Sequence, residues 1–183
     1  MIELALALLI AVGVLVLLRS LHRRAIRRAE LAWRPPGLRD AVLCYAECTF
    51  RTHRPFPMVA RVDRGYRSAG RVVLAELKTR RLAKVYPSDI LELSAQRVAL
   101  EAAAGEQVSD TAYVLVLEPG GRRTVHPVRL LSREEVTHIA QRRQAILAGA
   151  TEPRPARSDA LCRRCSHLKR CRPELAARYN EPA

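Results

Sequence analysis

Two carboxylates and a lysine lie close together in the middle of the sequence, in a pattern that suits metal-dependent hydrolysis. The segment Arg71–Lys78 reads RVVLAELK and ends with Glu76 and Lys78, while Asp63 lies near the end of the alternating apolar and polar stretch before it. Residues two apart in a strand project from the same face, so Glu76 and Lys78 should point together and Leu77 should turn into the core. Carboxylate oxygens hold Mg²⁺ or Mn²⁺, and an ammonium group steadies an attacking water and the developing charge.

A Glu-x-Lys triplet alone is more typical of a solvated strand face with an ion pair than of an active site. Here the triplet ends an apolar strand, follows a strand that carries Asp63, and precedes a predicted helix that carries Gln96. That conjunction is much rarer than the triplet. We therefore interpret Asp63, Glu76, Lys78 and Gln96 as the candidate catalytic group.

The second chemical pattern is CRRCSHLKRC, which has the spacing Cys-x₂-Cys-x₅-Cys from Cys162 through Cys165 to Cys171. Three thiolates within ten residues should share a soft cation or a cluster, because free surface thiols are prone to oxidation. A fourth ligand is then needed, and Cys44 and Cys48 are the only other cysteines. Their uneven distribution does not favour a set of paired disulfides. Zinc on four cysteines would have the same spacing, so the pattern leaves the metal open.

These residues are carried by a predicted α/β domain. We expect its first helix to run from Leu38 to about Arg51, because the preceding Arg-Pro-Pro-Gly cannot continue a helix. Cys44 and Cys48 would then share a helical face, with Glu47 between them.

Hydrophobic periodicity, turn residues and capping residues predict the remaining elements. The first is a β-hairpin of Met58–Tyr66 and Arg71–Lys78, with the second strand more buried. A helix capped by Ser88 and ended by Gly105 follows, and then two strands, Thr111–Glu118 and Thr124–Leu131. The last is a helix that begins with a capping box of Ser132 and Glu135 and reaches Leu147.

The N-terminal stretch LALALLIAVGVLVLL, from Leu4 to Leu18, is apolar throughout, and an arginine-rich segment follows it. A secretory signal peptide would carry its positive charge before the apolar run, so we interpret the run as an uncleaved anchor. It is slightly short for a bilayer core, but membranes thin and flanking side chains snorkel. The alternative is a buried core helix, which an amphipathic pattern would suit better. The basic flank places the rest of the chain at the cytoplasmic face of the inner membrane.

The chain is strongly basic, with 32 Lys and Arg against 18 Asp and Glu, a formal net charge of +14 and a sequence pI near 10.7. Such a charge favours polyanionic partners, either nucleic acid or an anionic membrane surface. Aromatic residues make up only 4% of the chain, so base stacking on exposed rings is excluded as the main mode of nucleic-acid binding. Contacts to backbone phosphates fit the composition better.

The pair VD at positions 62 and 63, followed by VVLAELKTR and LSAQRVAL, resembles the motifs of PD-(D/E)XK nucleases, in particular the RecB-like ones, over roughly residues 38 to 131. This resemblance implies a restriction-endonuclease-like core and Mg²⁺- or Mn²⁺-dependent hydrolysis of DNA. It implies that Asp63, Glu76 and the Leu77 carbonyl ligate the metal, that Lys78 acts on the water, and that Gln96 orients the site or the DNA.

The same resemblance implies a further ligand ahead of the aspartate, for which Glu47 and His53 are the candidates. The glutamine motif of the family usually has a tyrosine four residues later, where this chain has Leu100, and this departure weakens the expected DNA contact by that helix. The cysteine spacing also resembles the iron-sulfur staple of RecB-like and CRISPR-adaptation nucleases. By that resemblance Cys48, or alternatively Cys44, completes a [4Fe-4S] cluster with Cys162, Cys165 and Cys171.

The expected organisation is a transmembrane anchor over residues 1–18, a basic juxtamembrane linker over 19–37, a nuclease core over 38–150, and a linker with the cysteine cluster tail over 151–183. The expected function is a membrane-attached, metal-dependent deoxyribonuclease with a structural cluster. Two alternatives stay open: an inactive nucleic-acid-binding module on the same fold, and a membrane-bound redox or metal sensor. The complete trio of Asp63, Glu76 and Lys78 favours the catalyst.

Overall fold

The computed structural model describes residues 12–22, 25, 30–31, 34–154, 156, 159–163 and 165–180. The chain divides into two compact units, Met1–Thr137 and His138–Ala183. Among the described residues, no helix has both the length and the apolar character that crossing a membrane requires. The predicted anchor lies mainly outside these residues, of which the first is Val12.

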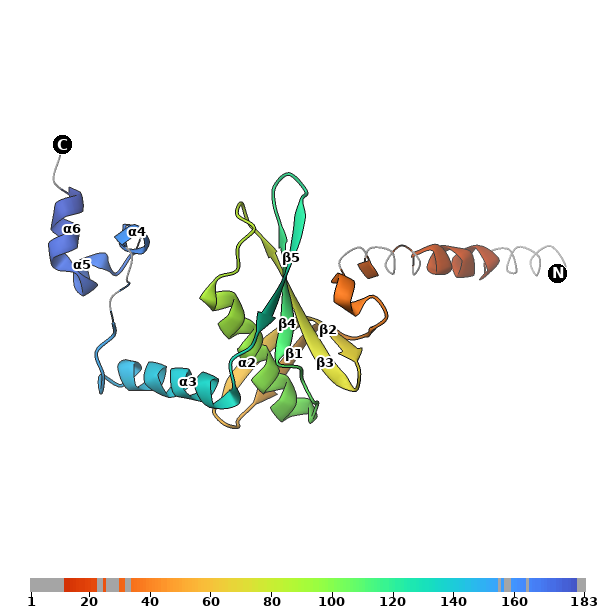
Figure 1. The fold of residues 1–183 in the computed structure, drawn as a ribbon, viewed down its shortest axis with the longest axis horizontal. Coiled ribbons are helices and arrows are strands. Elements are labelled where there is room, and N and C mark those ends of the chain that lie inside the picture. Colours follow the sequence, from red (N-terminus) through yellow and green to blue (C-terminus); the bar gives the residue numbers. More distant parts are fainter. Residues whose placement is uncertain are drawn as a thin grey trace, which may run out of the picture. The chain divides into compact units, whose positions relative to one another are not determined.

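The first unit is built on a five-stranded mixed sheet with the spatial order β1-β2-β3-β4-β5 (Figure 1). The strands β1, β2 and β3 form an antiparallel meander, β3 and β4 are parallel, and β4 and β5 are again antiparallel. Helix α2 connects the two parallel strands. The bounds are β1 Val42–Thr52, β2 Met58–Ser68, β3 Arg71–Thr79, α2 Pro87–Ala104, β4 Thr111–Leu117 and β5 Arg123–Arg129, with a short 3-10 helix η1 Pro36–Leu38 before them.

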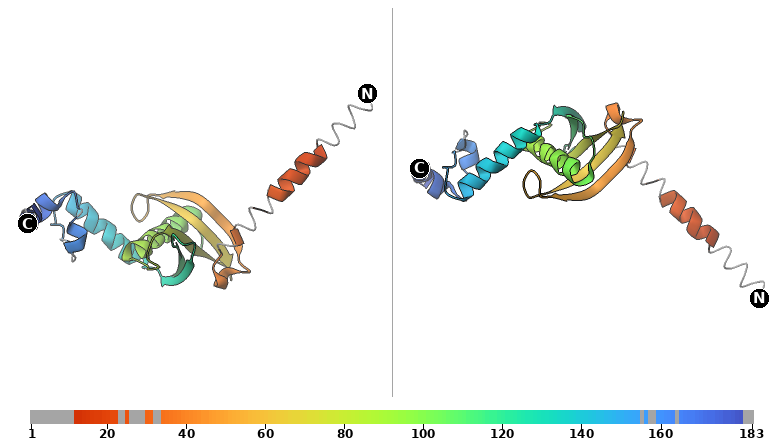
Figure 2. Two further views of the ribbon diagram at one scale, coloured as in Figure 1. Left: turned by 90° about the horizontal axis from the view of Figure 1, so that it is seen from above. Right: turned by 90° about the horizontal axis from the view of Figure 1, so that it is seen from below.

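Two hydrophobic clusters stabilise the sheet, one on each face. Helix α2 packs on one face (Figures 1 and 2), where Leu93 and Leu100 of the helix join buried residues of all the strands from β2 to β5. The second cluster is smaller and has no residue of α2. It consists of Leu38, Ala41, Tyr66, Ala75 and Leu115.

The predicted helix from Leu38 to Arg51 is wrong, because this segment is the 3-10 helix η1 followed by strand β1. The sequence VLCYAECTFRT is rich in β-branched and aromatic residues, which favour a half-buried strand. Strand β1 pairs with β2 from Val42 to Thr52. A register shift between Leu43 and Tyr45 interrupts the alternation of side chains that would otherwise have marked it as a strand.

The elements after Met58 agree with the predictions. The hairpin turns through Ala69 and Gly70, which both have positive φ, and α2 ends at Gly105 in the left-handed conformation. The predicted cap at Ser88 is wrong, because α2 begins one residue earlier and Tyr86 is its N-cap. The backbone N–H of Tyr86 donates to the carboxylate of Asp89 at 2.8 Å, which is the reciprocal hydrogen bond of a capping box.

The capping box at the start of helix α3, Arg133–Leu147, is confirmed. The backbone N–H of Glu135 donates to the Ser132 hydroxyl at 3.2 Å, and the N–H of Ser132 donates to the Glu135 carboxylate at 2.7 Å. Helix α3 continues into the second unit, which also contains the short helices α4 Asp159–Cys162, α5 Leu168–Cys171 and α6 Pro173–Asn180.

Candidate active site

The candidate site lies where β2 and β3 diverge. Their ladder of backbone hydrogen bonds ends at the pair Arg64–Ala75. From Ala75 onward β3 pairs with β4 instead, whereas β2 stays paired with β1 on its other side. Asp63 and Glu76 are the first residues beyond this last pair. The backbone N–H of Leu77, which an unbroken ladder would have used, donates instead to the Asp63 carboxylate at 3.2 Å. The two carboxylates predicted from the sequence are therefore brought to one place.

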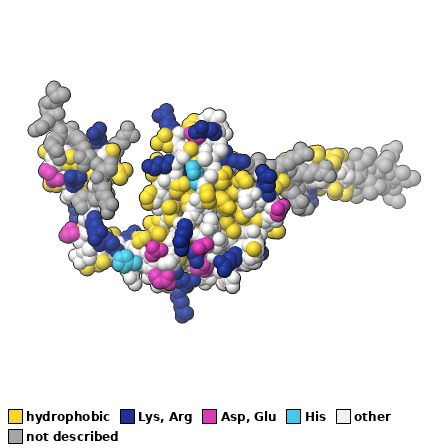
Figure 3. Space-filling view, viewed as in Figure 1, with side chains coloured by type: hydrophobic (Ala, Val, Ile, Leu, Met, Phe, Trp, Pro, Cys, Tyr) yellow, Lys and Arg dark blue, Asp and Glu magenta, His cyan; other side chains and the backbone are white. Residues whose placement is uncertain are grey.

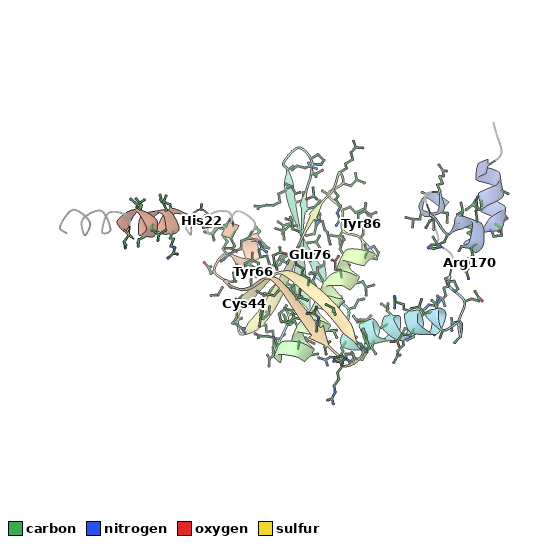
Figure 4. All side chains as sticks on the ribbon, turned by 180° about the vertical axis from the view of Figure 1, so that it is seen from behind. His22, Cys44, Tyr66, Glu76, Tyr86 and Arg170 are labelled. Atoms are coloured by element: carbon green, nitrogen blue, oxygen red, sulfur yellow. The ribbon has the colours of Figure 1, made fainter. Side chains whose placement is uncertain are left out.

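Glu76 is buried, with 4% of its surface exposed (Figure 4 labels it on β3). Its two carboxylate oxygens accept hydrogen bonds from Lys78 Nζ and from Gln96 Nε2, each at 2.8 Å. Burial raises the pKa of Glu76, and these two hydrogen bonds offset only part of that effect. Burial therefore makes this carboxylate costly to ionise in spite of the neighbouring cation and amide, and groups with a chemical task are often perturbed in this way.

Lys78 lies between two acidic side chains. Its ammonium group donates to Glu76 and, at 2.7 Å, to Glu92 on α2. Burial by itself lowers the pKa of Lys78, but the hydrogen bonds to both carboxylates outweigh it, and the pKa is raised overall. Lys78 therefore carries a full positive charge at neutral pH. Glu92 was not predicted as a site residue, although it stands four positions before Gln96 and so shares its helical face.

A cavity of about 160 Å³ opens beside the two carboxylates. Glu47 also lines it, and its carboxylate pairs with Arg61 at 2.7 Å and with Arg64 at 3.2 Å. Glu47 has a φ of 54°, a left-handed conformation that is uncommon outside glycine and is found more often at functional sites. His53 follows the end of β1 and does not line the cavity. The lining residues are Glu47, Asp63, Arg64, Tyr66, Ala75, Glu76, Leu77 and Leu115.

The prediction that Leu77 turns into the core is wrong, because 39% of its surface is exposed. It does point away from Glu76, as the alternation of a strand requires. On that face, however, the smaller hydrophobic cluster ends at Ala75, so that Leu77 forms part of the cavity wall.

Gln96 is buried on α2, and its amide group fixes the orientation of the Glu76 carboxylate. Its Oε1 atom is also buried and has no hydrogen-bond partner in the described part of the chain, so it can accept a hydrogen bond from a water or a ligand. Leu100, which stands where the family usually has a tyrosine, is fully buried in the cluster under α2. Its side chain therefore contributes to packing.

The two front cysteines lie on β1 and differ in their surroundings. Cys44 packs against the core cluster, its thiol donates to the Gly65 carbonyl at 3.1 Å, and burial raises its pKa. Among the described residues, the thiol of Cys48 bonds the Ala46 carbonyl of its own strand alone, at 3.4 Å. Of the two, Cys48 is the less constrained.

The three back cysteines belong to the second unit. The Cys165 N–H donates to the Cys162 carbonyl at 3.0 Å in a turn between two short helices, and Cys171 ends the second of these helices. Cys162 is buried, whereas Cys165 and Cys171 are exposed. Within the part of the chain that the structure describes, no group of three or more cysteine, histidine or carboxylate side chains is arranged to hold a metal ion.

A mixed five-stranded sheet with an Asp, a Glu-x-Lys triplet and a helical glutamine gathered at a strand fork is compatible with a restriction-endonuclease-like core. Residues 11–172 match the family model of the PD-(D/E)XK nuclease superfamily, and the chain belongs to that superfamily. No curated protein matches the sequence. Among solved structures, the chain is similar to the one titled "Crystal structure of SSO0001", with 14% identity and a TM-score of 0.50 over 86% of this chain and 69% of the other. At this identity the likeness supports the fold alone.

Proposed function

We propose that this chain is a Mg²⁺- or Mn²⁺-dependent deoxyribonuclease of the RecB-like type. Membership of the superfamily makes it a metal-dependent nuclease. The observation that carries the proposal is the convergence of Asp63, Glu76 and Lys78 at the fork of β2 and β3. A binding module that had lost its chemistry would be expected to lack at least one of these charges.

The donor groups of the cavity fit a hard divalent cation. Glu47, Asp63 and Glu76 all line one cavity, their carboxylate oxygens are ligands that a hard cation prefers, and no described thiol or imidazole lines it. In the metal-free arrangement these side chains are not yet grouped as a metal site, so a cation would have to draw them together. When bound, Mg²⁺ or Mn²⁺ supplies a Lewis acid that polarises the phosphate and activates a water. The three carboxylates now accept from nitrogen donors, which a cation would replace in part. Because Glu47 lines the cavity and His53 does not, we assign the ligand ahead of the aspartate to Glu47.

The other side chains have separate tasks in this proposal. Lys78 places a fixed positive charge beside the position of the attacking water, and the carboxylates of Glu76 and Glu92 hold it there. Gln96 fixes the Glu76 carboxylate from the opposite side. Arg64 lines the same cavity and offers a guanidinium to the phosphate once Glu47 binds the metal.

The test is hydrolysis of DNA by the purified full-length chain and its variants with Mg²⁺, Mn²⁺ or EDTA. Asp63→Ala and Glu76→Ala should abolish cleavage. Lys78→Ala should leave metal and DNA binding intact, while turnover falls by about 10²- to 10³-fold, as for the loss of one preorganised electrostatic contact. Arg142→Ala, a change in the second unit, is the control and should keep the turnover of the parent. Cleavage by Lys78→Ala at the parent's rate would favour the binding module, and cleavage of RNA alone would correct the substrate.

We also propose that residues 1–18 anchor the nuclease at the cytoplasmic face of the inner membrane. Within the described helical residues 12–22, the side chains of Val12, Val14, Leu15, Val16, Leu17 and Leu18 are all exposed. An apolar surface on every side of a helix needs an apolar surrounding, which a bilayer provides.

A [4Fe-4S] cluster on Cys162, Cys165, Cys171 and one front cysteine completes the proposal, with zinc as the alternative metal. Four thiolates are a donor set that suits either group. We assign the fourth position to Cys48, because the thiol of Cys44 is tied to the Gly65 carbonyl and packs against the core. A redox-sensing role for this cluster would leave the chemistry at Glu76 unchanged.

A further inference from the structure

The loop that follows β3, residues 80–86, begins two residues after Lys78 and is firmly held at its base. The backbone N–H of Arg80 donates to the Leu117 carbonyl at 3.1 Å, which ties the loop to the end of β4. The Arg80 guanidinium binds both carboxylate oxygens of Asp89 at 3.0 Å and stacks on the Tyr86 ring at 4.9 Å. The neighbouring Val85 packs against the core cluster.

The tip of this loop presents an aliphatic side chain between two cations. Leu82 is 63% exposed, and Arg81 and Lys84 on either side of it are exposed as well. The Lys84 N–H donates to the Leu82 carbonyl at 2.8 Å, so the tip is a closed turn. The Lys84 ammonium lies 5.7 Å from the centre of the Tyr86 ring. Single exposed leucines are common on protein surfaces, but this one stands on a constrained turn beside the site.

The loop leaves the sheet at the end of β3 that carries Lys78. Because β3 and β4 are parallel, the loop after β3 and the turn after β4 leave the sheet at the same edge. Figure 1 shows both projecting from that edge, and Figure 3 shows Lys and Arg side chains at the two projections. Lys78, which is near this end of β3, already bonds Glu92 in the second turn of α2. A polyanion that reaches Glu76 from this edge meets the loop tip.

We propose that residues 81–84 bind the DNA strand beside the scissile bond, with Arg81 and Lys84 on phosphates and Leu82 inserted between two bases. This inference rests on the proposed deoxyribonuclease function and adds a contact surface to it. Apolar wedges of this kind separate stacked bases, and flanking cations hold the backbone during the insertion. A protein partner fits less well, because two cations border one small apolar side chain. The chain has few aromatic residues, so an aliphatic wedge can supply the base contact that rings supply elsewhere.

The decisive experiment measures base unstacking without cleavage. The full-length chain is mixed with duplex DNA that carries 2-aminopurine at successive positions, in Ca²⁺ in place of Mg²⁺. The parent should raise the 2-aminopurine fluorescence severalfold at one or two adjacent positions, and Leu82→Ala should abolish the rise while binding weakens by less than about tenfold. Val59→Ala is the matched control, because Val59 is an equally exposed aliphatic residue on β2. A rise that survives Leu82→Ala overturns the wedge.

The two cations are tested through the salt dependence of binding. Each lost phosphate contact lowers the slope of log K against log salt by about 0.9, so the double variant Arg81→Ala/Lys84→Ala should lower it by about 1.8. The control is Arg51→Ala/Arg71→Ala, which removes the same charge from exposed sites, one of them at the opposite end of β3. An unchanged slope in the first double variant, or an equal change in both, overturns the phosphate contacts.

Hydrolysis of bis(p-nitrophenyl) phosphate separates this inference from the proposed function. This diester has neither bases nor flanking phosphates, so the loop variants should cleave it at the parent's rate, whereas Glu76→Ala should not cleave it. Equal hydrolysis by the parent and Glu76→Ala contradicts the proposed function whatever the fluorescence shows. Normal hydrolysis with unchanged unstacking in Leu82→Ala contradicts only the wedge.

Discussion

Arg34→Ala is expected to destabilise the first unit strongly, because one guanidinium joins the segment before the sheet to the wall of the candidate site. It binds the carboxylate of Glu30 with two hydrogen bonds, at 3.1 and 2.8 Å, and donates to the carbonyls of Arg39 and Ala41 at 2.8 and 2.6 Å. It also lies 5.2 Å from the centre of the Tyr66 ring. Tyr66 is 1% exposed and lines the cavity. Burial and a hydrogen bond with Glu30 raise the pKa of its hydroxyl to about 12.

The size of the effect follows from these contacts. The side chains of Arg34 and Glu30 are only 12% and 14% exposed, so removing the cation leaves a mostly buried carboxylate without its partner. Breaking a buried pair in this way costs about 3–5 kcal/mol, and each carbonyl that loses a charged donor adds up to about 1.5–3 kcal/mol where water cannot replace it. Because neighbouring terms are not additive, we expect about 4 kcal/mol in total. For a unit of this size that lowers Tm by roughly 16 °C.

The assay is thermal unfolding of the full-length chain in detergent, followed by circular dichroism. Arg51→Ala, which removes an exposed arginine from β1, should shift Tm by less than about 2 °C. Glu30→Ala in the Arg34→Ala background should recover part of the loss, because it removes the carboxylate that was left without its partner. A Tm for Arg34→Ala within 2 °C of the parent would refute the reasoning. A large loss would place Glu30 and Arg34 within the nuclease domain, so that soluble versions should begin before residue 30.

Three further predictions concern the site, the cluster and the anchor. Because burial raises the pKa of Glu76, its ionisation destabilises the metal-free fold as pH rises from about 4.5 through the raised pKa. In EDTA, Glu76→Gln should therefore have a higher Tm than the parent at pH 7 and lose that advantage below about pH 4.5. A lower Tm of the variant at pH 7 would contradict this. Protein isolated without oxygen should be brown and lose most of its visible absorption in Cys171→Ser but not in Cys44→Ser, whereas stoichiometric zinc without iron would show the metal to be wrong. A reporter fused after Ala183 should be active only in its cytoplasmic form, and full-length chain in the soluble fraction would count against the anchor.

The correctly predicted elements are those whose ends are determined by residues at or next to the boundary itself. Gly70 and Gly105 adopt positive φ where the sequence predicts a turn and a helix end, and Ser132 with Glu135 forms its capping box. Each of these signals acts over a few residues and needs no partner from elsewhere in the chain.

Strand β1 was mispredicted because its signal is not local. Cys44 and Cys48 four positions apart imitate a helical face, while the register shift after Leu43 and the left-handed Glu47 break the alternation of a strand. What decides the conformation is pairing with β2, which lies up to 25 residues away at the pair Val42–Arg67. Single-sequence patterns do not contain that information.

The difference between local and non-local signals also separates the predicted site residues from those that the sequence does not reveal. Asp63, Glu76 and Lys78 are close in sequence to a recognisable apolar strand. Arg64 and Tyr66 enter the site only through the cavity that the fork creates, and Tyr66 does so from the face opposite α2. No pattern of residue types predicts such a cavity, since its walls come from four strands.

The charges around the fork explain how a buried carboxylate and a metal ion can share it. The carboxylates are Glu47, Asp63, Glu76 and Glu92, and the cations paired with them are Arg61, Arg64 and Lys78. With these groups in their usual charge states, the metal-free site is one negative charge from neutrality, which favours the binding of a cation. A bound divalent metal would reverse the sign to one positive charge, and a phosphodiester carries one negative charge. Binding of metal and of substrate should then each favour the other, because only the two together leave the site neutral.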